Sequence, residues 1–194
     1  MLELKKSNPW IFWPSSICDT FPVNPADKHL GGGSNFDLTL EFTLKDESKE
    51  QKTLFCILPH YTGLDLHEDF MVFTVSFQEK TEYFKLPLLI VPNEYTKLRV
   101  VHRVNQYLNL FINSAMVLNV NFGANTWKTD GSPHIILGSG NFPRNGFNLN
   151  YTEYNLHSFE LKVEEELVAN HKFEEFIFDK SVDLTDNCNF LHKI

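Results

Sequence analysis

The sequence predicts an all-β protein, an antiparallel β-sandwich with minimal helix, and three neighbouring segments carry this prediction. Residues 97–104 and 107–112 alternate apolar and polar side chains, the period of a strand with one face in a core. Residues 113–115 (Asn-Ser-Ala) predict a tight reversal, and 116–122 form the returning arm of a hairpin. Because short turns join the three segments, they form an antiparallel meander. No long segment has the helical period.

Length and composition favour one large sandwich. A chain of 194 residues is long enough for a sizeable core and short for two ordinary domains. Its hydrophobic share of 42% lies in the usual globular range. The aromatic share of 14%, with 18 phenylalanines, suits strands that pack side chains between two sheets.

The charge balance excludes some classes of partner. The net charge of −8 argues against non-specific binding to nucleic acid, which needs a basic face. No apolar run approaches the roughly 20 residues of a membrane span, so no membrane insertion is expected. No secretory signal follows the first residues, which predicts a cytoplasmic protein or part of a larger one. The widely spaced Cys18, Cys56 and Cys188 favour free thiols, with one disulfide as the alternative.

The region 1–34 is predicted to be an irregular N-terminal arm. It contains four prolines, which interrupt strand ladders, and a run of three glycines. Trp10, Phe12 and Trp13 are the aromatic side chains that would dock it onto the sandwich. The rest of the chain, 35–194, is predicted to be a single β-sandwich.

Alternation and turn residues place the remaining strands. Between the strands at 53–58 and 70–77, residues 59–69 are expected to form a polar loop. Two further loops are expected at 123–133 and 141–151, which are rich in Gly and Asn. The run 164–166 (Glu-Glu-Glu) is expected to be a solvated turn. The other predicted strands are 36–42, 82–91, 134–138, 154–163, which alternates with one irregularity, and one or two strands within 168–178.

The order of these features resembles the concanavalin A-like lectin/glucanase superfamily, especially its laminin-G-like branch, over about residues 35 to 175. Tyr95 stands near the place where that family commonly has tryptophan, and Asn113-Ser114 replaces its usual Asp-Gly or Asn-Gly turn. The similar segments are 36–42, 98–101, 108–114, 135–138, which ends in glycine, and 156–161.

The C-terminal segment has a resemblance of its own. Residues 167–173 and 183–190 are similar to the segment that usually opens such a domain in bacterial proteins. Here they lie at the other end of the chain. Two interpretations therefore stay open: residues 168–194 complete the sheet, or they lead into a further module.

The resemblance implies a jelly roll with one concave sheet, on which many members of the superfamily bind carbohydrate. Its glucanases carry paired carboxylates on one strand, and retaining hydrolysis needs two carboxyl groups about 5–5.5 Å apart. No apolar strand of this sequence carries acids at i, i+2 and i+5. We therefore expect a non-catalytic protein. Fold alone does not settle function, so a site must be argued from residues.

A polar face is predicted on the central meander. If the apolar residues of the strands at 97–104 and 107–112 face the core, the polar ones share the other surface. An aromatic ring with planar donors and acceptors around it suits an acidic or hydroxyl-rich ligand. The ligand-binding candidates on this face are Arg99, Arg103, Asn109, Phe111 and Asn113, and those in the rim loops are Trp127, Asp130, Asn141, Arg144, Asn145, Asn148 and Tyr151.

No cofactor is expected, with one weaker option. Calcium sites need several oxygen ligands from loops. Asp65, Asp69 and Asp130 are the candidates, and no EF-hand spacing supports them. No thiolate or histidine ligand pattern for another metal is present.

The sequence thus predicts a lectin-like module that recognises a glycan or polysaccharide on a concave sheet and its rim loops. A structural or oligomerisation sandwich and a divergent glycan-degrading enzyme are the alternatives. A homo-oligomer or attachment to another domain also stays open.

Overall fold

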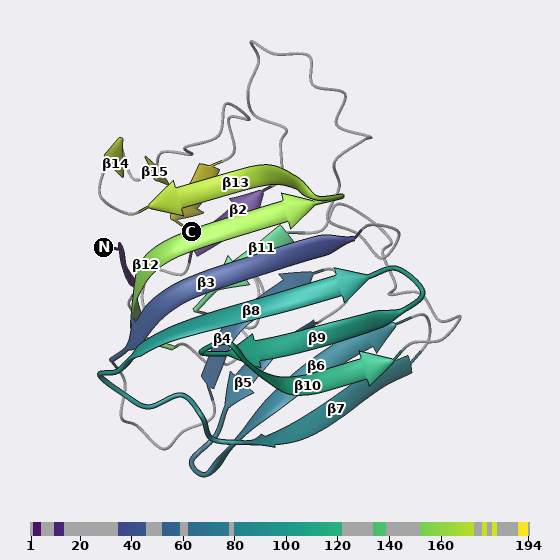
Figure 1. Cartoon of the computed structure of the whole chain (residues 1–194). Coiled ribbons are helices and arrows are strands. Elements are labelled where there is room, and N and C mark those ends of the chain that lie inside the picture. Colours follow the sequence, from purple (N-terminus) through teal and green to yellow (C-terminus); the bar gives the residue numbers. More distant parts are fainter. Residues whose placement is uncertain are drawn as a thin grey trace.

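The computed structural model describes residues 2–4, 10–13, 35–45, 52–58, 62–77, 80–121, 134–138, 152–172, 176–177, 180–181 and 190–193. Every regular element in these ranges is a β-strand, and the strands form two antiparallel sheets (Figure 1). The predicted all-β class is confirmed. The described part of the chain contains no helix that is long and apolar enough to cross a membrane.

The first sheet faces the viewer in Figure 1. Its strands run in the order β1-β12-β3-β8-β9-β10, and β13 pairs with a different stretch of β12 from β1. The strands are β1 (Leu2–Leu4), β3 (Phe36–Leu44), β8 (Tyr95–Arg103), β9 (Tyr107–Ile112), β10 (Ala115–Asn121), β12 (Tyr154–Val163) and β13 (Glu166–Lys172).

The second sheet lies behind the first. Its order is β14-β15-β16-β2-β11-β4-β5-β6-β7. The strands are β2 (Trp10–Trp13), β4 (Lys52–Leu58), β5 (Thr62–Leu66), β6 (Phe70–Phe77), β7 (Lys80–Pro87), β11 (His134–Leu137), β14 (Phe176–Ile177), β15 (Lys180–Ser181) and β16 (Phe190–Lys193).

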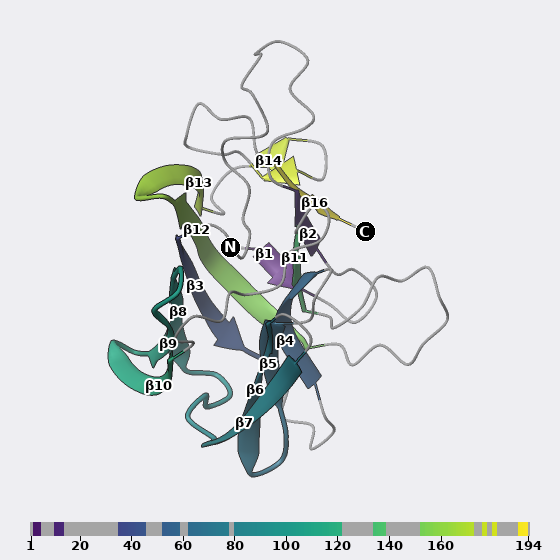
Figure 2. The ribbon, with the colours of Figure 1, turned by 90° about the vertical axis from the view of Figure 1, so that its right-hand side faces the viewer.

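The core lies between the two layers, which Figure 2 shows edge-on. On β3, Phe36, Leu38, Leu40 and Phe42 alternate inward and are almost completely buried. Burying such a side chain contributes about 1.5–3 kcal/mol, so the alternation fixes which side of β3 faces inward. Tyr154 on β12 reaches across the core, where its hydroxyl donates to a carbonyl oxygen of β4 at 3.0 Å.

The β9–β10 hairpin confirms the predicted reversal. Asn113 and Ser114 form its turn with φ values of 49° and 71°, the left-handed conformation that two-residue hairpin turns require. The turn is also tied to β8, because the Asn113 side-chain oxygen accepts from the backbone N–H of Lys97 at 2.9 Å. The register therefore rests on a side-chain contact as well as on the hydrophobic pattern.

The prediction of one polar loop between β4 and β6 is wrong for residues 62–66, which form β5. All of β5 is buried, and it lies inside the second sheet. Gly63 approaches β4 so closely that an added Cβ would collide with the carbonyl oxygen of Phe55. Asp65 accepts a hydrogen bond from the Thr53 hydroxyl at 2.6 Å. Glycine and aspartate are normally turn signals, and here they serve close packing and a buried hydrogen bond.

The prediction of an irregular arm over 1–34 is wrong for β1 and β2, which pair with β12 and β11. Pro9 and Pro14 flank β2 in the sequence, so the missing N–H groups of proline fall outside that strand and leave Trp10–Trp13 able to pair. At the other end of the chain, β13 joins the first sheet and β16 pairs with β2 in the second. The division into domains stays a prediction.

Candidate functional site

The outward side of the first sheet carries polar side chains in rows that cross its strands. Alternation on β3, β8, β9 and β12 sends apolar residues into the core and polar residues outward, and the pairing sets outward residues of neighbouring strands side by side. We call this surface the polar face. It comprises Asp37, Glu41 and Thr43 on β3, Tyr95, Lys97, Arg99 and Arg103 on β8, Asn109 and Phe111 on β9, and Asn155, His157, Ser158 and Glu160 on β12.

Arg99 and Phe111 stand opposite each other on β8 and β9. The guanidinium carbon of Arg99 lies 5.8 Å from the centre of the Phe111 ring, within the range of a cation–π contact. Its Nε donates to Asp37 Oδ1 at 2.8 Å, and a second nitrogen donates to the other carboxylate oxygen. This hydrogen bonding raises the pKa of Arg99. A carboxylate of the protein therefore already occupies the fork that would bind an acidic ligand.

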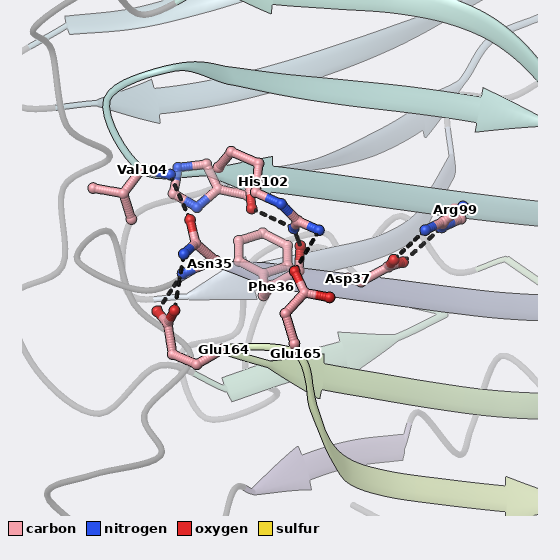
Figure 3. A network of polar contacts seen from close by, with 9 residues as sticks. Asn35, Phe36, Asp37, Arg99, His102, Val104, Glu164 and Glu165 are labelled. Atoms are coloured by element: carbon pink, nitrogen blue, oxygen red, sulfur yellow. Dashed lines mark hydrogen bonds and ion pairs between the residues drawn. The ribbon is translucent and has the colours of Figure 1, made fainter.

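Arg103, at the end of β8, is held by the turn between β12 and β13. Its Nη2 lies 2.8 Å from Glu165 Oε1. The neighbouring Glu164 accepts from the Asn35 backbone at 2.6 Å and from its side chain at 2.8 Å, and Asn35 in turn accepts from the backbone of Val104 (Figure 3). These contacts join three strand ends.

The turn predicted at 164–166 is exposed to solvent as expected, and two of its carboxylates also bind neighbouring residues. Glu164 and Glu165 do form the turn, with φ values of 50° and 66°, and Glu166 begins β13. Non-glycine residues rarely adopt this conformation, which costs about 1–2 kcal/mol per residue. The two carboxylates bind Asn35 and Arg103, so their contacts offset part of that strain.

The other two candidates of the meander have different surroundings. Asn109 is half-buried on β9, and its side chain is hydrogen-bonded to Asn119 of β10. Asn113 lies in the hairpin turn, where its side chain holds Lys97. Arg99, Arg103, Asn109 and Phe111 thus share the polar face as predicted, whereas Asn113 stands at its margin with a structural contact.

A cluster that sequence reasoning missed lies at the opposite end of the polar face, where β8 begins. Glu41 accepts from Lys97 Nζ at 2.8 Å and from Ser158 Oγ at 2.8 Å, and the Tyr95 hydroxyl also binds this carboxylate. The hydrogen bond from Lys97 is the main reason that the pKa of Glu41 lies below its ordinary value. Burial and the Glu41 carboxylate raise the pKa of Tyr95.

His157 belongs to the same cluster. Its Nε2 lies 2.9 Å from the Thr43 hydroxyl, and its ring centre lies 5.6 Å from that of Tyr95 at an interplanar angle of 33°. Burial lowers the pKa of His157, so the ring is neutral at neutral pH. The register of β12 shifts between Leu156 and Ser158, and this β-bulge brings His157 and Ser158 to the same outward side.

The sequence did contain a signal for this bulge. Leu156 and Phe159 both face the core, yet three positions separate them where strict alternation allows two or four. The irregularity was visible in the strand prediction for 154–163. An irregularity of this kind indicates a β-bulge, which turns one extra side chain outward.

The predicted rim residues lie outside the described residues and stay predictions. They are Trp127, Asp130, Asn141, Arg144, Asn145, Asn148 and Tyr151.

The weak calcium candidates are not brought together in the described part of the chain. Asp65 is buried within β5 and holds Thr53, while Asp69 is exposed in the bend before β6. Asp130 lies outside the described residues. Across the described ranges, no group of three or more His, Cys, Asp or Glu side chains could hold a metal ion.

No known family model and no curated protein matches the sequence. The fold, in contrast, is similar to solved structures. A candidate carbohydrate-binding protein from Bacteroides ovatus matches 99% of this chain and 58% of its own, with a TM-score of 0.60 and 11% identity. The CBM40 domain of Ruminococcus gnavus IT-sialidase, solved with α2,3-sialyllactose, matches 87% of this chain and 89% of its own, with a TM-score of 0.54 and 11% identity.

A third similar structure is the receptor-binding domain of botulinum neurotoxin D, which matches 81% of this chain and 41% of its own, with a TM-score of 0.53 and 12% identity. This chain therefore spans less than two thirds of the Bacteroides ovatus and neurotoxin structures. At such identities the likeness establishes the fold alone. The chain has the fold of lectin-like β-sandwich domains.

Proposed function

We propose that this chain is a non-catalytic carbohydrate-binding module that holds a glycan on the polar face of the first sheet. The observation that carries the proposal is the one-sided exposure of that sheet. Its inner side is sealed in the core, and its outer side presents aromatic rings among hydrogen-bonding side chains. Sugars need this combination, because their C–H faces stack on rings and their hydroxyl groups hydrogen-bond to amides and carboxylates.

The fold adds support, since the Bacteroides ovatus and Ruminococcus gnavus structures with the same architecture are described as carbohydrate-binding. The more specific assignment to the concanavalin A-like superfamily and its laminin-G-like branch is part of the proposal and rests on the order of sequence features. The rim residues Trp127, Asp130 and Arg144 stay within it as further candidates.

A glycan array followed by calorimetric titration tests this function. We expect saturable binding of at least one glycan class, with an accompanying rise in melting temperature because the ligand binds only the folded state. Binding to no glycan would remove the proposal. Release of new reducing ends from a bound glycan would overturn its non-catalytic part.

One observation favours the rival function of an oligomerisation module. After β7, the chain crosses to β8 through residues 88–94, where Leu88, Leu89 and Val91 are 38%, 40% and 46% exposed and Ile90 is buried. A strand was predicted to continue here, yet β7 ends at Pro87. Exposed apolar side chains that lie close together are a feature of protein interfaces. Light scattering decides: a stable oligomer that Leu88→Ser and Leu89→Ser together dissociate, in a protein that binds no glycan, would support the rival.

A further inference from the structure

We propose that the glycan is anchored at the Tyr95 end of the polar face, and that the sugar bound there is uncharged. We call Tyr95, His157, Thr43, Asn155 and Glu41 the Tyr95 subsite. The inference rests on the proposed function and names both a place and a ligand class for it. None of these five residues was among the candidates drawn from the sequence.

The subsite offers an aromatic platform. Tyr95 is 54% exposed, although it belongs to a strand whose alternate residues are buried. Its ring meets that of His157 above β3, because β3 pairs with β8 on one side and with β12 on the other. The shallow interplanar angle of 33° lets the two rings line one surface for the C–H face of a sugar.

The subsite also contains an unused acceptor. The side-chain oxygen of Asn155 is buried and has no hydrogen-bond partner in the protein. Asn155 stands opposite Thr43 on β3, and Thr43 stands opposite Tyr95 on β8, so the three lie in one row across the sheet. An acceptor in a buried position calls for a donor. The hydroxyl group of a sugar supplies one and can accept from a neighbouring donor at the same time.

Charge selects the ligand class. Lys97, Arg99 and Arg103 are the cations of this face on β8, and each is paired with a carboxylate: Glu41, Asp37 and Glu165, respectively. Glu41 stays ionised at neutral pH, since hydrogen bonding lowers its pKa, and His157 is uncharged there. A sialic or uronic acid would bring its carboxylate toward that of Glu41 with no unpaired cation of β8 to receive it. A neutral hexose or N-acetylhexosamine has no such conflict.

The β-bulge of β12 is the element that builds the subsite. Without the extra residue, strict alternation would leave a single outward side chain after the inward Leu156. Every later residue of β12 would then face the opposite side of the sheet. With it, His157 and Ser158 both face outward, one toward Thr43 and the other toward Glu41. Bulges re-aim side chains next to binding sites.

The test uses the whole chain and begins with wild-type protein on an array of neutral, sialylated and uronic-acid glycans. We expect the strongest signals from neutral termini. The best neutral oligosaccharide is then titrated against Tyr95→Ala and Tyr95→Phe. The first change removes the platform and should weaken affinity about tenfold or more, whereas the second keeps the ring and should cost clearly less.

Tyr83→Ala is the matched control, because Tyr83 is also an exposed strand tyrosine, 72% exposed, but lies on β7 of the second sheet. The Tyr83→Ala variant should bind the oligosaccharide with the affinity of wild type. Melting curves confirm that each variant is folded. Should wild type bind a glycan while folded Tyr95→Ala binds it equally well, the subsite is wrong and the proposed function stands. A preference for sialylated glycans overturns the ligand class, and binding to no glycan removes the function and the subsite together.

Discussion

The outer faces of the two sheets differ in how far their side chains are exposed to solvent. On the first sheet most outward side chains are partly or largely exposed, and Arg99, for example, keeps 47% of its side-chain surface. On the second sheet the outward residues of β4 and β5 are covered: Cys56, Thr53 and Asp65 are 0%, 3% and 8% exposed. Among the strands whose exposure the structure describes, this face opens toward the edge strand β7, where Tyr83 is exposed.

This contrast separates binding surface from scaffold. Side chains on an exposed sheet face exchange contacts with water at little cost, so they are free to serve a ligand. Side chains buried on both faces of a sheet must fit their neighbours, because interiors are close-packed. We therefore expect the same substitution to have unlike effects on the two faces, and the following tests address that difference.

The largest effect is expected at Gly63 in β5. Gly63→Ala would place a methyl group against the carbonyl oxygen of Phe55, a backbone atom that cannot move without shifting β4. We predict a loss of about 3 kcal/mol or more in unfolding free energy, measured by urea denaturation. Asn109→Ala on the first sheet is the control and should stay within about 0.5 kcal/mol. Equal losses in the two variants would erase the contrast between the faces.

A matched pair of threonines gives the next largest difference. Thr53→Val in β4 removes the hydroxyl that donates to buried Asp65, and we predict a loss of about 1–3 kcal/mol. Thr43→Val on the polar face removes a hydroxyl that contacts His157 in a half-buried position, and water can replace it in part. Chemical denaturation of both variants measures the difference. A larger loss for Thr43→Val would contradict the ranking.

The ion pair between Asp37 and Arg99 should contribute little to stability. The double-mutant cycle with Asp37→Asn and Arg99→Gln is predicted to give a coupling free energy of about 0.5 kcal/mol, because the arginine is largely exposed and the pair is screened by salt. Repeating the cycle in high salt should reduce the coupling further. A coupling free energy above about 2 kcal/mol would mean that the pair behaves as a buried one.

The smallest expected effect is the change in stability that Glu41 causes as the pH falls. The folded state holds the pKa of Glu41 below its ordinary value of 4.5, so the carboxylate stabilises the fold at neutral pH. This contribution is lost as the pH falls below about 4.5 and the carboxylate takes up a proton. Glu41→Gln should therefore lower stability more at neutral pH than in acid, as measured by urea denaturation at both pH values. An equal loss of stability at both pH values would show that the contacts of Lys97 and Tyr95 with Glu41 do not depend on the charge of its carboxylate.

The same contrast explains how much of the fold could be predicted. Alternation marks a strand when one face meets water, so β3, β8, β9 and β12 were found from Leu38, Leu108 and their neighbours. β5 is buried on both sides and lacks that signal, and its Gly63 and Asp65 are residue types that usually indicate loops and turns. The short strands β1 and β2 are too brief for a period to be recognised.

The candidate site was predictable only in part. Alternation in two strands that are adjacent in the sequence predicts that Arg99 and Phe111 lie on the same face of the sheet, as they do. Lys97 and Arg99 on β8 are paired with Glu41 and Asp37 on β3, which are far from them in sequence. The pattern of one strand does not show which distant strand it pairs with, so these ion pairs could not be predicted. The direction of His157 depends on one inserted residue, which a two-residue period cannot resolve.

The pairing of β16 with β2 has a consequence for how the molecule assembles. Trp10 pairs with Lys193, so its neighbour exists only after all of the intervening polypeptide has been synthesised. Contacts so remote along the chain make folding slow. Until β16 pairs with it, one edge of β2 has unpaired backbone N–H and C=O groups. Other strands can pair with that edge, including strands of other newly made molecules.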